Sequence, residues 1–190
     1  MDKRRLVREM LKRFDQPHLE KVLAVLNSLV TRGLLSGYAI SGSFAALYYA
    51  QPILTYDLDV CCLFPPSGPL ADLSPLYAHL RSLGYEPQGE YVPMEGIPVQ
   101  FISAAPGSLS AEAVATAREV VYRGAPTRIV RLEYLLAIMA ELARPRDIAK
   151  LAVLLEEAAF DAAALNLILA AHGLTQRWAA IRRRIHEPLV

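Results

Sequence analysis

The chain has 190 residues, of which 54% are hydrophobic and 21% charged, and its formal net charge is +1. This composition fits one well-packed domain, or a sheet domain with a helical appendage, and excludes an intrinsically disordered chain. The small net charge excludes nucleic-acid binding driven by overall charge. The two cysteines, Cys61 and Cys62, are adjacent. They predict reduced core residues and exclude a disulfide framework.

The chain begins with charged residues and contains no long uncharged apolar stretch. This pattern predicts neither a signal peptide nor a membrane-spanning helix. We therefore expect a cytoplasmic protein that does not use a membrane as its partner.

The first third of the chain predicts three helices and two strands. Apolar residues at helical spacing indicate the second helix, and Gly33 ends it. The expected elements are helices over residues 2–14, 18–31 and 43–50 and strands over residues 38–40 and 57–64.

The rest of the chain predicts further strands and then a run of helices. A helix that Gly84 closes precedes two strands and a late hairpin at the edge of the sheet. The helices are expected over 72–83, 132–143, 145–158, 161–171 and 174–186, and the strands over 85–92, 97–102, 120–123 and 127–130. Asp161 and Thr175 are suitable helix N-caps.

These elements predict an α+β fold in which helices flank a mixed sheet and a helical region follows it. We divide the chain into N-terminal helices that pack on the core (1–35), a sheet domain (36–131) and a C-terminal helical region (132–190). No internal repeat interrupts this order.

The most informative stretch places a Gly42-Ser43 turn before a strand that carries Asp57 and Asp59. Residues two apart on a strand project to the same face, so the two carboxylates point together. Paired carboxylates can share a divalent cation such as Mg²⁺. A glycine at the turn lets a phosphate approach the backbone before a helix. Each feature alone also fits a plain loop or a solvated strand end.

At these residues the chain resembles the nucleotidyltransferase superfamily, and within it the toxin-type AbiEii-like bacterial branch. Four stretches carry the resemblance: Ser41 to Tyr48, Thr55 to Asp59, Glu133 to Ala137 and Arg144 to Asp147. The likeness covers residues 36–156. It implies a nucleotidyltransferase-like fold for the sheet and its helices.

The resemblance also implies a reaction, in which a nucleotidyl group passes from a nucleoside triphosphate to an acceptor hydroxyl. Asp57 and Asp59 would be catalytic residues that hold Mg²⁺, or Mn²⁺, on the triphosphate. Gly42 and Ser43 would bind its β- and γ-phosphates. A later helix could also present cationic groups toward the triphosphate, and these are Arg144, Arg146 and Lys150. An exposed run of this kind is more often a solvated helix face, and the sequence leaves that alternative open.

The third catalytic position departs from the superfamily pattern, because Gln100 stands where a later strand should carry an acid. An amide cannot act as a general base, although it can accept a hydrogen bond or offer a weak carbonyl ligand. Glu95 is a candidate substitute in a nearby loop. The branch also tends to place a lysine near Met139 and an aspartate near Lys150, and neither is present.

Two functions follow, and the sequence leaves both open. The first is a nucleotidyltransferase that acts on an unidentified RNA or protein acceptor, with an antitoxin or another protein as a further partner. The alternative is a nucleotide-binding or partner-binding module that kept the fold and lost turnover. A third and weaker interpretation treats the carboxylate pair as incidental and the protein as a helical interaction domain. Basic residues cluster near both ends of the chain. They would favour an RNA acceptor, or they are simply the solvated faces of terminal helices. The residues are Arg4, Arg5, Arg8, Lys12 and Arg13 near one end and Arg182, Arg183 and Arg184 near the other.

Overall fold

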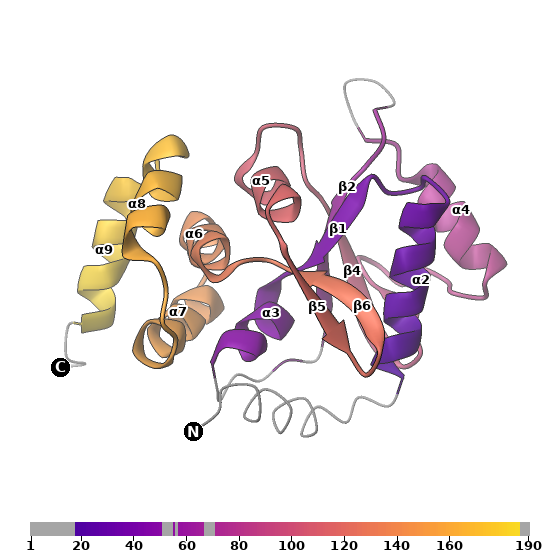
Figure 1. Cartoon of the computed structure of the whole chain (residues 1–190), viewed down its shortest axis with the longest axis horizontal. Coiled ribbons are helices and arrows are strands. Elements are labelled where there is room, and N and C mark those ends of the chain that lie inside the picture. The colour runs from indigo at the N-terminus through magenta and orange to yellow at the C-terminus, as the bar shows by residue number, and fades with distance from the viewer. Residues whose placement is uncertain (1–17, 51–54, 56, 67–70, 187–190) are drawn as a thin grey trace.

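The computed structural model describes residues 18–50, 55, 57–66 and 71–186 of the chain. The helix expected over residues 2–14 and the basic residues within it lie outside this described part. Within it, the model forms one mixed sheet with helices around it and a group of helices beyond it (Figure 1).

The sheet contains six strands in the order β3-β4-β2-β1-β6-β5. β2 runs parallel to β4 and β1 parallel to β6, whereas the other neighbours are antiparallel. The strands are β1 (Gly37–Ile40), β2 (Leu58–Leu63), β3 (Val92–Met94), β4 (Ile97–Ser103), β5 (Arg118–Tyr122) and β6 (Ala125–Ile129). In the central pair of strands, β2 carries Asp59, and the chain leaves β1 toward Gly42 and Ser43.

Helices cover both faces of the sheet, and a further group of helices lies beyond one end of it. In Figure 1, α2 and α4 lie on one side of the sheet and α5 on the other, and α6 to α9 form a group beside α3. The helices are α2 (Leu19–Thr31), α3 (Gly42–Tyr49), α4 (Ser74–Ser82), α5 (Leu109–Ala115), α6 (Leu132–Leu142), α7 (Pro145–Glu157), α8 (Ala162–Ala171) and α9 (Thr175–His186). The expected α+β class is thus confirmed, while the division at residues 35 and 131 stays a prediction.

Alternation along β2 orients its side chains. Leu58 and Val60 are fully buried in the core, whereas Asp59 between them is only partly buried on the opposite face. Cys61 and Cys62 are buried free thiols, as the sequence predicted. The strand is therefore anchored by its apolar face and presents one carboxylate from the other.

Two local expectations were wrong, and both fail for reasons of backbone chemistry. The strand expected over residues 85–92 is reduced to β3, because Gly89 sits in a tight turn in which Gln88 and Tyr91 form an isolated bridge. Helix α5 was not anticipated. Its start is marked by Ser108, whose hydroxyl accepts a hydrogen bond from the Ala111 amide.

The late hairpin and the helix caps agree with the sequence in part. The hairpin forms at the sheet edge, but its turn is Arg123-Gly124, where both residues have positive φ, 47° and 85°. Asp161 caps α8 by accepting hydrogen bonds from two backbone amides. Thr175 is the first residue of α9 and not the cap before it. No helix among the described residues is long and apolar enough to cross a membrane.

Candidate active site

The carboxylate pair lies at the start of β2. Asp57 precedes the strand and Asp59 is its second residue. The Thr55 hydroxyl holds the first of them, with its oxygen 3.0 Å from the Asp57 carbonyl oxygen and 3.4 Å from Oδ1. The charge of Asp57 also acts on Asp59, so the two groups sense each other electrostatically. That the two carboxylates share one face and one cation stays a prediction, since Asp57 lies before the first residue of β2.

The Gly42 turn is fitted against the Asp59 carboxylate. Gly42 has a φ of +57°, and a Cβ added there would lie 1.8 Å from Asp59 Oδ2. The Ser41 amide donates a hydrogen bond of 2.9 Å to the Asp59 carbonyl oxygen. Only glycine leaves room for a carboxylate this close to the first turn of α3. The turn and the acid, 17 positions apart in the sequence, thus form one cradle.

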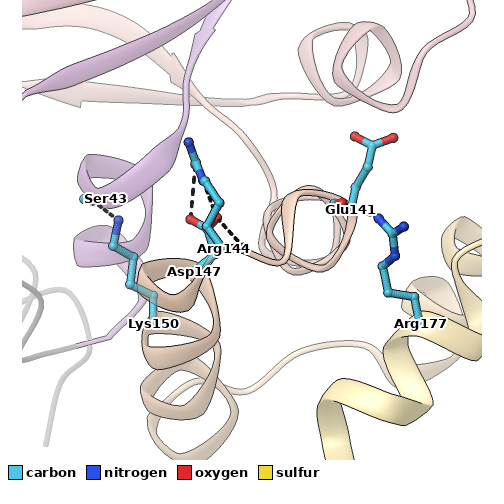
Figure 2. A network of polar contacts seen from close by, with 6 residues as sticks. All are labelled: Ser43, Glu141, Arg144, Asp147, Lys150 and Arg177. Carbon is cyan, nitrogen blue, oxygen red and sulfur yellow. Dashed lines mark hydrogen bonds and ion pairs between the residues drawn. The ribbon is translucent and has the colours of Figure 1, made fainter.

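A lysine from α7 closes the cradle from the side of the helical region. Lys150 Nζ donates a hydrogen bond to the Ser43 hydroxyl, across 107 positions of sequence (Figure 2). Burial lowers the pKa of this ammonium, while the charges of Asp147, Asp59 and Asp57 oppose that shift. A cation is therefore held beside the serine that the sequence assigned to phosphate binding.

Arg144 and Arg146, which flank Pro145 at the start of α7, differ in their contacts. Arg144 Nε lies 2.6 Å from Asp147 Oδ2, and the same carboxylate oxygen accepts a hydrogen bond of 3.3 Å from the Arg144 backbone amide at the start of α7. The side-chain hydrogen bond raises the pKa of the guanidinium. Asp147 is only 2% exposed, so this helix start is not a simple solvated face. The Arg146 side chain is exposed, and its charge lowers the pKa of Asp59 slightly.

Burial gives Asp59 an unusual proton affinity. It raises the pKa of Asp59 to about 6, and the neighbouring charge of Asp57 adds to the effect. Lys150, Arg144 and Arg146 act in the opposite direction. A group with these neighbours is poised to exchange its proton for a cation near neutral pH.

Gln100 occupies the place beside Asp59 that the sequence assigned to a third catalytic group. It pairs with Asp59 in the parallel register of β2 and β4, so both side chains leave the same face. Its amide Nε2 donates a hydrogen bond of 2.8 Å to Glu90 Oε2. The Tyr91 hydroxyl lies 3.5 Å from Asp57 Oδ2. Sequence reasoning missed Glu90, and the only signal for it was an acid directly before a strand.

Comparison with known proteins concerns the fold. No protein-family model and no curated protein matches the chain. Among solved structures, it is similar to an antigenic nucleotidyltransferase-like protein from Paracoccidioides brasiliensis, with 17% identity, a TM-score of 0.53 and coverage of 90% of this chain and 93% of that one. It is also similar to the antibiotic-resistance factor ANT(2'')-Ia, with 15% identity, a TM-score of 0.49 and coverage of 88% and 96%.

The chain has a nucleotidyltransferase-like fold. In this fold the structure brings together the predicted Gly42, Ser43, Asp57 and Asp59, and α7 adds Lys150 to them. Gln100 joins from the neighbouring strand. Glu95, the candidate substitute for a third acid, is engaged elsewhere: its carboxylate accepts a hydrogen bond from Tyr85 and pairs with Lys21 at 3.3 Å.

The donor set of this nucleotidyltransferase-like fold suits a hard divalent cation. Asp57 and Asp59 offer oxygen ligands, which Mg²⁺ prefers, and Mg²⁺ commonly takes one or two carboxylates with water and phosphate oxygens. Among the described residues, no three His, Cys, Asp or Glu side chains gather as a complete metal site. The remaining ligands would have to come from water and substrate.

A separate hollow of about 520 Å³ lies between α2 and the β5–β6 edge of the sheet. Its lining includes Asn27, Tyr38 and Thr127, which are linked by hydrogen bonds to one another. None of its lining residues belongs to the carboxylate cradle.

Proposed function

We propose that the protein binds a nucleoside triphosphate with Mg²⁺, or Mn²⁺ in its place, and transfers a nucleotidyl group to an acceptor hydroxyl. The observation that carries this proposal is the contact between the Gly42 backbone and the Asp59 carboxylate, closed by the bond from Lys150 to Ser43. Backbone amides, a hydroxyl, a cation and two carboxylates then converge on one point. This combination suits a triphosphate, which needs donors for its oxygens and a cation to neutralise its charge.

Each group has a distinct role in this proposal. Asp57 and Asp59 would hold Mg²⁺, which supplies neutralisation of the phosphate charge and polarisation of the α-phosphate when bound. Gly42 and Ser43 would bind the terminal phosphates through backbone and hydroxyl donors. Lys150 would pair with the phosphate oxygens as a point charge. Asp147 holds the Arg144 guanidinium in one orientation. Positioning and charge stabilisation would then supply the rate enhancement.

Titration with each of the four common nucleoside triphosphates tests the proposal, with and without Mg²⁺. We expect one or more of them to bind only with the cation, and an α-labelled triphosphate to label total cellular RNA or protein. The Asp57→Asn/Asp59→Asn variant should fold and lose Mg²⁺-dependent binding. Asp72→Asn is the matched control, since Asp72 is exposed before α4. Cation-independent binding in the wild type would contradict the proposal.

The second candidate is a nucleotide-binding module without turnover. Gln100 favours it, because an amide stands beside Asp59 where a base would be useful. In that case triphosphate and Mg²⁺ bind as above, yet no label reaches any acceptor. The same labelling experiment therefore separates the two functions.

The acceptor and the protein partner follow from the AbiEii-like likeness in the sequence. We propose a toxin-type modification of an RNA or protein, and an antitoxin or another protein as partner. For an RNA acceptor, the exposed Arg183 and Arg184 on α9 offer charges that can face a phosphate backbone. Replacing both by Ala should then weaken RNA binding and its salt dependence, without changing triphosphate affinity.

A further inference from the structure

A third acidic residue, Glu90, is linked to the cradle through Gln100. The Gln100 amide donates 2.8 Å to Glu90 Oε2, and Gln100 is itself the register partner of Asp59. Glu90 stands in the tight turn between Gln88 and Tyr91, whose backbones exchange hydrogen bonds of 2.7 and 3.2 Å. The turn thus holds the acid over the strand that lies next to β2.

Tyr91 shows where this turn faces. Its hydroxyl lies 3.5 Å from Asp57 Oδ2. After burial, the negative charges of Glu90, Asp57 and Asp59 are what raise the pKa of Tyr91. Because Tyr91 of this turn reaches Asp57 and Glu90 accepts from Gln100, the turn lies on the face of the sheet that carries Asp59 and Gln100.

Glu95, in the turn between β3 and β4, does not share this position. Its carboxylate accepts from Tyr85 at 2.9 Å and pairs with Lys21 at 3.3 Å. Those partners come from the segment after α4 and from α2, which lies against the other face of the sheet (Figure 1). Of the two acids near Gln100, only Glu90 contacts it in the structure.

We propose that Glu90 is the proton acceptor of the transfer reaction and that Gln100 is the positioning residue that holds it. The inference rests on the proposed function. The oxygen of the acceptor hydroxyl bonds to the α-phosphorus of the nucleoside triphosphate, and its proton passes to the Glu90 carboxylate, directly or through one water. The bond from the α-phosphorus to the bridging oxygen breaks, and its electron pair leaves with pyrophosphate.

This assignment explains why an amide serves at position 100. A carboxylate there would stand beside Asp59 and face Glu90, and like charges at such distances repel. An amide instead donates a hydrogen bond to the Glu90 carboxylate and orients it. The carboxylate is thus on the turn, as Glu90, and the strand position where the superfamily pattern has an acid carries a neutral hydrogen-bond donor, Gln100.

The first test compares Glu90→Gln with Glu95→Gln, which removes the same charge five positions further along the chain. We expect Glu90→Gln to slow nucleotidyl transfer by about 10²- to 10⁴-fold, as loss of a general base does. Its affinity for Mn²⁺, measured by electron paramagnetic resonance without nucleotide, should change less than about threefold, since Glu90 is not one of the two carboxylates that would hold the cation. Glu95→Gln should match the wild type in both measurements.

The second test uses Gln100→Glu, for which the two measurements should move in opposite directions. A third carboxylate beside Asp59 should tighten Mn²⁺ binding by about threefold or more. Transfer should slow at least tenfold, because the new charge repels Glu90 and removes its donor. If position 100 simply lacked its acid, affinity and rate would both rise.

The outcomes separate this inference from the proposed function. A wild type that binds triphosphate and Mn²⁺ but transfers no label overturns the transfer function and the role of Glu90 together. A wild type that transfers label while Glu90→Gln transfers it equally fast overturns the role of Glu90 alone. A rise in both measurements for Gln100→Glu also overturns it. Slow transfer by Glu90→Gln with unchanged Mn²⁺ affinity supports it.

Discussion

Single residues decide the chemistry proposed for this site, and the roles that the sequence assigned to them stay predictions. Asp57 and Asp59 could be picked out from the sequence as a pair, because residues two apart on a strand share a face. Glu90 could not, because its position depends on a turn that the strand expected over residues 85–92 had concealed. Gln100 was placed only by resemblance, since no local pattern reveals which strands become neighbours.

Gly42→Ala should destabilise the protein and abolish Mg²⁺-dependent triphosphate binding. The left-handed backbone costs a residue with a Cβ about 1–2 kcal/mol, and the Cβ would also push Asp59 Oδ2 from 1.8 Å. Gly33→Ala is the control, because its φ is +70° and nothing lies within 4 Å of an added Cβ. Urea unfolding and triphosphate titration measure both effects. Equal losses in the two variants would show that the contact with Asp59 has no consequence.

The raised pKa of Asp59 predicts how stability depends on pH without divalent cations. Because the folded pKa is about 6 and the ordinary value 3.8, the folded state holds this proton more tightly. Its contribution to stability is therefore present below pH 4 and is lost as pH rises to 6, by about 3 kcal/mol at most. Asp59→Asn should match the wild type at pH 4 and exceed its stability at pH 7. Urea unfolding at four pH values checks this, and a pH-independent difference would contradict it.

At the scale of elements, the residues that begin and end helices and turns determined what the sequence could predict. The C-terminal helices were expected within a few residues of their ends, since caps and apolar spacing agree there. The Gln88–Tyr91 turn and the short α5 were missed, because a few residues carry too little periodicity to separate turn, strand and helix. The start of α7 is the element most directly tied to the site.

Asp147→Asn should destabilise the protein by about 1–3 kcal/mol, because it removes a buried charged partner of Arg144. It should also weaken triphosphate binding, since the freed guanidinium and the shifted helix start no longer hold Lys150 in place. Asp161→Asn is the matched control: Asp161 caps α8 from an exposed position, and Asn caps nearly as well as Asp. Denaturant unfolding of both variants measures the difference. A change as small in Asp147→Asn as in the control would contradict the structural role of this pair.

At the scale of the whole molecule, the cradle belongs to segments that are distant in the sequence. The sequence predicted the order of sheet and helices and placed Lys150 toward the triphosphate that Ser43 would bind. It did not predict the direct hydrogen bond between Lys150 and Ser43, across 107 positions. Loop lengths and apolar faces allow several arrangements of four C-terminal helices, so this contact is a property of the packed fold. The C-terminal helices are also linked to one another, because Arg177 of α9 donates a hydrogen bond to the Glu141 carbonyl oxygen of α6 (Figure 2).

Lys150→Met should therefore weaken triphosphate binding about 10- to 100-fold while the protein stays folded. A charge-assisted hydrogen bond contributes roughly 1.5–3 kcal/mol, and methionine keeps the half-buried stem packed. Lys21→Met is the control, because Lys21 is an exposed lysine that pairs with Glu95 outside the cradle. Calorimetric titration with triphosphate and Mg²⁺ measures the affinity, and thermal unfolding verifies the fold. Unchanged affinity in Lys150→Met would mean that the helical region closes over the sheet without taking part in binding, and the triphosphate would then have to rest on Gly42, Ser43 and the cation alone.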